Sequence, residues 1–132
     1  MALEYEEVAE RVIGAAIEVH RELGQGFLES IYELALAILL RDRQVPFARQ
    51  VTIPVLYRGV EVGFHRLDFF VAEEIVVELK AIKDLEDVHF AVVKSYLCAV
   101  RRNHGLILNF SKPSLKIKRV STKDPFPGFL DS

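Results

Sequence analysis

Three charged residues interrupt apolar segments in the middle of this chain, and their types and spacing suit metal-dependent chemistry. Asp68 lies within one apolar run, and the tripeptide Glu78-Leu79-Lys80 ends the next. Because side chains alternate faces along a strand, Glu78 and Lys80 should lie on the same face. Charges removed from water are costly unless they are paired or bind a metal. The combination predicts a site, whereas an ion pair on an edge or exposed face is the commoner explanation for an isolated Glu-x-Lys.

The chemistry expected of this group is phosphodiester hydrolysis with a hard divalent cation. Mg²⁺ is usually held by one or two carboxylates together with waters and substrate phosphate, so Asp68 and Glu78 are the natural ligands. Lys80 could orient or deprotonate a metal-bound water, or stabilise the charge of the transition state. Because the neighbouring carboxylates favour its charged form, we expect orientation and charge stabilisation.

Periodicity and turn residues divide the chain into eight elements that must position these residues. The expected order is α-α-β-β-β-α-β-β, with helices over 4–23, 27–43 and 88–101 and strands over 50–57, 60–71, 75–81, 105–110 and 115–120. The first three strands should form an antiparallel meander, with Pro54 at a bulge or edge position. Asp84 or Asp87 should cap the third helix, which crosses over to a parallel strand.

One domain of the α/β class follows from this order. Residues 1–122 should form a mixed β-sheet flanked by helices, and residues 123–132 should form an extended C-terminal tail. The chain has 132 residues, of which 51% are hydrophobic and 27% charged, as in ordinary globular domains. The one cysteine, Cys98, lies in an apolar stretch, where we expect it to be buried without a disulfide partner.

The start of the chain is acidic, unlike a signal peptide, and no apolar run is long enough to span a membrane. We therefore expect a cytoplasmic protein with no membrane partner.

The net charge of −2 hides an asymmetry along the chain. Residues 1–79 carry 7 Arg and Lys against 14 Asp and Glu, whereas residues 80–132 carry 10 against 5. An acidic part that holds a cation and a basic part that holds phosphates would suit a metal-dependent nuclease, although chain halves need not form separate faces. The low overall charge argues against strong nonspecific binding to duplex DNA. The candidate nucleic-acid contacts are Lys94, Arg101, Arg102, Lys116 and Lys118.

The order of Asp68, the Glu78–Lys80 tripeptide and a following helix resembles the PD-(D/E)XK nuclease superfamily. The segment 26–32, GFLESIY, looks like the motif that names the GxxExxY proteins, a branch of that superfamily, and the similarity extends over nearly the whole chain. The resemblance implies a restriction-endonuclease-like core, a Mg²⁺ or Mn²⁺ cofactor and a nucleic acid substrate. It also implies that the main-chain carbonyl of Leu79 and the carboxylate of Glu29 complete the metal site.

Several other residues at family-like positions are open to two interpretations. Glu29 could instead complement the dipole of its helix. Tyr32, one turn further on, could hydrogen-bond Glu29 or a phosphate, or could simply pack. His20, His89 and Tyr96 could line the cleft or serve structural roles.

Three functions therefore remain open. The first is a metal-dependent phosphodiesterase, which the intact set of ligands and lysine favours. The second is a non-catalytic module of the same fold that binds nucleic acid or a protein through the basic segment 112–123. Val92 favours it, because it replaces a glutamine that related nucleases commonly carry on this helix. The third is a homodimer or small adaptor with a vestigial carboxylate cluster. No separate recognition domain is evident, so a protein partner would supply sequence specificity.

Overall fold

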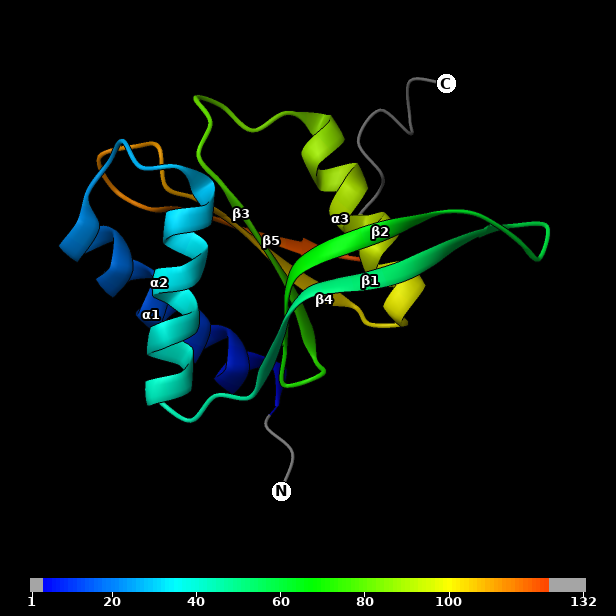
Figure 1. The fold of residues 1–132 in the computed structure, drawn as a ribbon, viewed down its shortest axis with the longest axis horizontal. Helices are drawn as coiled ribbons and strands as arrows, with labels where there is room; N and C mark the ends of the chain where they lie inside the picture. Colours follow the sequence, from blue (N-terminus) through cyan, green and yellow to red (C-terminus); the bar gives the residue numbers. More distant parts are fainter. Residues whose placement is uncertain (1–3, 124–132) are drawn as a thin grey trace.

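The computed structural model describes residues 4–123 and has the expected order of elements (Figure 1). The helices and strands are α1 (Tyr5–Leu23), α2 (Glu29–Asp42), β1 (Phe47–Tyr57), β2 (Val60–Val71), β3 (Ile75–Lys80), α3 (Asp87–Val100), β4 (His104–Asn109) and β5 (Lys116–Ser121). The tail expected over 123–132 lies outside the described residues, apart from Lys123.

The five strands form one mixed sheet in the order β1-β2-β3-β4-β5. β3 and β4 pair in parallel across the α3 crossover, and all other neighbours are antiparallel. Side chains of α1 and α2 form a core with one face of the sheet, and α3 packs on the opposite face. The predicted α/β class and mixed sheet are confirmed.

Alternation along β3 decides where the charged residues of this strand point. Ile75, Val77 and Leu79 face α1 and α2, whereas Val76 packs with the residues of α3. By this alternation Glu78 and Lys80 share the α3 face with Val76. The apolar side chains before them are fully buried, so the register of the strand is fixed and the two charged side chains cannot exchange faces.

α3 approaches the sheet closely at a glycine. A Cβ atom at Gly105 in β4 would lie 3.0 Å from Cγ1 of Val93 and 3.1 Å from the carbonyl oxygen of Val76. Both distances are tighter than most Cβ contacts in proteins, so a larger residue here would require Val93 of α3 or the main chain of β3 to shift by a few tenths of an ångström.

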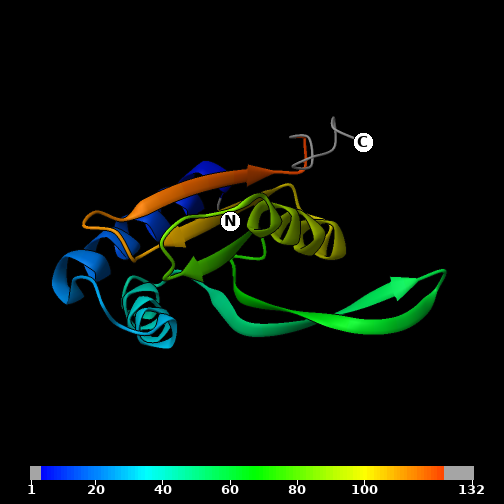
Figure 2. The same ribbon diagram turned by 90° about the horizontal axis from the view of Figure 1, so that it is seen from above.

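β1 and β2 continue as a two-stranded hairpin beyond the rest of the molecule (Figure 2). Pro54 lies in β1, which is an edge strand, and the pairing register shifts between Val55 and Leu56. The edge position expected for Pro54 is confirmed.

Three local predictions need correction. β1 begins at Phe47, three residues before the expected start. Glu86, rather than Asp84 or Asp87, caps α3, because its side chain accepts the backbone N–H of His89 while its own N–H donates to Nδ1 of His89 at 2.8 Å. Cys98 is exposed rather than buried. Within residues 4–123, no helix is long and apolar enough to cross a bilayer.

Candidate active site

Asp68 and Glu78 face each other at the point where β2 and β3 stop pairing. The last paired residues are Phe69 and Val77, and the register places Asp68 opposite Glu78. Each carboxylate accepts a hydrogen bond from a main-chain N–H of the other strand. The Asp68 N–H donates to Glu78 Oε1 and the Leu79 N–H donates to Asp68 Oδ2, both at 2.9 Å. These hydrogen bonds take the place of main-chain hydrogen bonds between β2 and β3 where the strands separate, and they hold both carboxylates in position.

Burial and mutual repulsion favour the protonated form of this acid pair. Glu78 is only 5% exposed. Burial, followed by the charge of Asp68, raises the pKa of Glu78 to about 9. Burial also raises the pKa of Asp68, against a lowering by the hydrogen bond from Leu79. Both shifts are in the direction that favours one proton held by the pair in the absence of a cation.

Lys80 and Glu29 complete the group around the acid pair. Glu29 begins α2 and is half-buried. Burial raises its pKa, the charge of Lys80 lowers it, and the charge of Asp68 raises it. The ammonium of Lys80 also lowers the pKa of Asp68 and of Glu78. One lysine thus acts on three carboxylates, so the structure brings together the four residues that the sequence singled out.

Glu33, one turn after Glu29, was not among the predicted residues. Its carboxylate accepts hydrogen bonds from Arg49 Nη1 at 2.6 Å and from Gln50 Nε2 at 2.8 Å. Its charge raises the pKa of both Asp68 and Glu29. The one available signal was an acid at i+4 from Glu29 in a helix that is apolar nearly all round.

Gln50 was missed as well, and its backbone explains why β1 bends beside the site. Its φ is +53°, in the left-handed region that non-glycine residues rarely adopt. Gln50 lies opposite Asp68, but the two do not form a pair in the register of β1 and β2. The hydrogen bond from its amide to Glu33 helps to hold this conformation. Strained residues of this kind occur often at functional sites.

Tyr96 reaches the acid pair from α3. Burial raises the pKa of Tyr96 to about 12, and the nearby charges of Glu78 and Asp68 add to this effect. Its ring packs edge-on against His65, whose Nε2 lies 2.8 Å from Ser95 Oγ. The phenol therefore stays protonated and can donate a hydrogen bond within the site.

Tyr32 and His20 have structural contacts, and each also lines a pocket. The Tyr32 hydroxyl donates to the Gly24 carbonyl at 2.6 Å and accepts the Phe27 N–H at 3.3 Å, and its ring stacks on Phe110. These bonds hold the loop in which Gly26 has a φ of +99°, so Tyr32 fixes the start of α2. Nε2 of His20 lies 2.8 Å from the carbonyl oxygen of Lys112.

The remaining candidates other than Lys94, which is buried in α3, lie apart from the acid pair. His89 is the partner in the α3 capping box. Arg102 donates to the carbonyl of Glu73 at the opposite end of β3, and Arg101 caps the C-terminus of α3. Lys94 is 3% exposed. Lys116 and Lys118 line a separate pocket.

The donor set suits a hard cation that keeps part of its hydration shell. Within residues 4–123, no three His, Cys, Asp or Glu side chains are arranged to hold a metal by themselves. Mg²⁺ needs only one or two carboxylates when waters and substrate phosphate supply the rest. Each carboxylate of the acid pair has one oxygen bonded to the main chain, and the charge of Asp68 disfavours ionisation of Glu78. A dication between them would remove that repulsion, so the residues fit such an ion.

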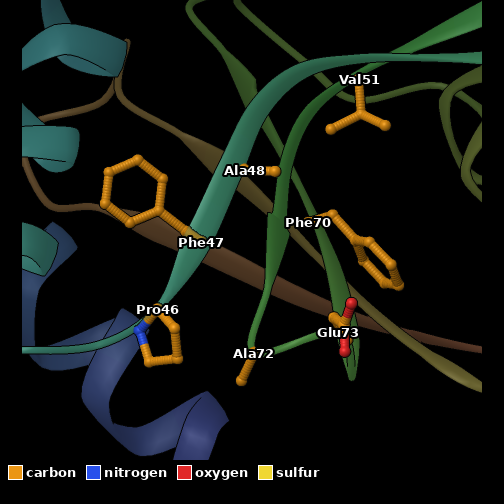
Figure 3. A pocket seen from close by; sticks show the side chains of 7 residues that line it. All are labelled: Pro46, Phe47, Ala48, Val51, Phe70, Ala72 and Glu73. Carbon is orange, nitrogen blue, oxygen red and sulfur yellow. The ribbon is translucent and has the colours of Figure 1, made fainter.

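Another pocket lies between the start of β1 and the end of β2 (Figure 3). It measures about 380 Å³, and its lining includes Phe47, Val51 and Phe70. Its one carboxylate is Glu73, and neither member of the acid pair reaches it. We assign the chemistry to the acid pair.

Comparison with known proteins agrees with this arrangement. A family model of the PD-(D/E)XK nuclease superfamily matches residues 6–120. No curated protein sequence matches the chain. Among solved structures, the crystal structure of SSO0001 is similar in fold, with a TM-score of 0.58 and 15% sequence identity. The similarity covers 78% of this chain but 55% of that one. Because the family model spans most of the sequence, the chain belongs to the PD-(D/E)XK nuclease superfamily.

Proposed function

We propose that the protein is a metal-dependent phosphodiesterase that hydrolyses DNA or RNA, and that it belongs to the GxxExxY branch of the superfamily. The observation that carries the proposal is the reciprocal bonding of Asp68 and Glu78 beside Lys80. A bound Mg²⁺ or Mn²⁺ would be held by these two carboxylates and the Leu79 carbonyl, with Glu29 direct or through water, and would activate a water and polarise the phosphate.

The residues of the chain have separate roles in this proposal. Lys80 orients the attacking water and stabilises charge that develops on the phosphate. Tyr96 donates a hydrogen bond from a phenol that remains protonated at the pH of catalysis. Glu33 and Gln50 keep β1 and α2 in place beside Asp68, so they position the site without touching the substrate.

A binding module without catalytic activity is the second candidate. Val92 is the observation that favours it, because this partly exposed apolar residue cannot hydrogen-bond a phosphate or a metal-bound water. Such a module would bind nucleic acid or a protein partner, alone or as a homodimer.

A metal titration separates the two candidates. We expect cleavage of labelled single- and double-stranded DNA and RNA to require Mg²⁺ or Mn²⁺ and to stop when EDTA is added. Lys80→Ala should lower the cleavage rate about 100-fold or more. Arg41→Ala, which removes an exposed basic side chain in the last turn of α2, away from the site, should leave the rate unchanged. Binding without cleavage at every metal concentration would favour the module, and cleavage that survives Lys80→Ala would contradict the roles assigned here.

A further inference from the structure

A pocket of about 350 Å³ lies on the α3 face of the sheet, and the lysines of β5 that line it are two strands away from Glu78 of the acid pair. It is bounded by the β3–α3 loop, α3, β4 and the β4–β5 region. We call it the lysine pocket, because its lining includes Lys83, Lys112, Lys116 and Lys118 together with Phe90 and Asn109. Its volume is within the range of small-ligand sites.

The charge of the lysine pocket is largely unneutralised. Lys112 lies 3.6 Å from Asp84, the one acid in the lining. Within residues 4–123, Lys83, Lys116 and Lys118 form no ion pair. Several lysines around one pocket select for an anionic ligand, and an ammonium binds phosphate as a point charge.

Asn109 holds two of the segments that line the pocket in fixed positions. Its Oδ1 accepts the N–H groups of Ile82 and Ser111 at 3.2 and 3.3 Å, and its Nδ2 donates to the Ile82 carbonyl at 2.9 Å. These bonds join the β3–α3 loop to the segment after β4. The loops that carry Lys83 and Lys112 are therefore held in place before a ligand binds.

The sheet register connects the lysine pocket to the acid pair. Glu78 pairs with Ile107, and Ile107 pairs with Lys118, so all three lie in one row across the α3 face. Lys80, Asn109 and Lys116 form the next row. Two strand spacings separate the members at the ends of each row, which is about 10 Å between their main chains. The middle residues of the rows, Ile107 and Asn109, are buried, so a strand that binds at both places must pass over the residues that cover them.

Phe90 gives the lysine pocket a second kind of contact. It is half-buried on α3 among the lysines, next to Leu85. An aromatic ring beside lysines suits a nucleotide, whose base stacks while its phosphate binds ammonium groups. A base can enter such a pocket only when it is not stacked within a duplex.

We propose that the lysine pocket is the binding subsite for a nucleotide on the same face as the phosphodiester that is cut and about two strand spacings from it, so that the substrate is single-stranded nucleic acid. This inference rests on the proposed function and names its substrate class. Lys116 and Lys118 bind the phosphates of that nucleotide, and Phe90 stacks on its base.

Binding measured in EDTA tests the subsite independently of cleavage. Fluorescence anisotropy should show that a labelled single strand of about 12 nucleotides binds about 10-fold more tightly than a duplex of the same length. Phe90→Leu should weaken single-strand binding about 10-fold and leave its salt dependence unchanged. Replacing both Lys116 and Lys118 by alanine should weaken binding and reduce the salt slope by about 1.4.

Arg119→Ala is the matched control, because Arg119 adjoins Lys118 in β5 but faces α1, where it contacts Tyr5 and Glu6. It should change binding less than about 2-fold. Equal losses for Arg119→Ala and Lys118→Ala, equal binding of duplex and single strand, or displacement of the strand by poly-glutamate would each overturn the proposal. Failure of metal-dependent cleavage with these binding results intact would refute the hydrolase instead.

Discussion

Asp68→Asn and Glu78→Gln are each expected to reduce metal-dependent cleavage about 1,000-fold or more. Both changes keep the shape of the side chain but remove an anionic oxygen from the acid pair. The amides can still accept the main-chain hydrogen bonds of Leu79 and Asp68, so the sheet should remain folded. Initial rates at saturating Mn²⁺, with circular dichroism as a check on folding, measure the effect.

Glu61→Gln is the control for this experiment, because Glu61 is an exposed carboxylate of the same strand as Asp68. Its cleavage rate should equal that of the unmodified protein. If Glu78→Gln retained normal cleavage, the acid pair could not be the metal site.

The stability of the metal-free protein is expected to fall as the pH rises from 6 to 8. Because the pKa of Glu78 is raised to about 9 in the folded state, that state keeps a proton which the unfolded chain has already released. The unfolded state therefore binds fewer protons, and the free energy of unfolding decreases by about 1.4 kcal/mol per pH unit, or about 3 kcal/mol over this range.

Urea unfolding in EDTA at the two pH values measures this difference. Glu78→Gln removes the titrating group. Between pH 6 and 8, the free energy of unfolding of this variant should therefore decrease by about 3 kcal/mol less than that of the unmodified protein. Glu61→Gln should keep the full dependence. Identical pH profiles for the unmodified protein and Glu78→Gln would show that the buried pair holds no extra proton.

The sequence predicted the fold because its local signals and its core agree. Val76, Val77 and Leu79 are buried in the structure, so the apolar run of β3 fixes both the strand and its register. The register then decides that Glu78 and Lys80 lie on the α3 face. Asp68 could be placed opposite Glu78 because a short turn joins β2 and β3.

The parts that could not be predicted depend on contacts between distant residues. Glu33 belongs to the surroundings of the site because Arg49 and Gln50, from the next element, bond to it. The positive φ of Gln50 has no local signal, since glutamine does not favour that conformation. The contacts of Tyr32 could not be predicted from its position one turn after Glu29, because its hydroxyl donates to the carbonyl of Gly24, before the helix, and holds the loop.

The prediction of the residue that caps α3 was wrong for a different reason. Asp84, Glu86 and Asp87 are all acids that can lie near a helix start, and composition does not choose between them. The choice follows from His89, because its ring accepts the Glu86 N–H and so completes the box only for that residue. The same contact keeps His89 out of the acid pair, although its position in the chain resembles that of a cleft residue.

A crystal soaked in Mn²⁺ tests the central claim most directly, because the anomalous signal locates the ion without any assumption about substrate. We predict a peak between the side chains of Asp68 and Glu78, next to the main-chain carbonyl of Leu79, and no peak at this place in a crystal of Glu78→Gln. An ordered peak elsewhere in the molecule, with the acid pair still bonded to the main chain and free of metal, would contradict the proposed site and the hydrolytic function built on it.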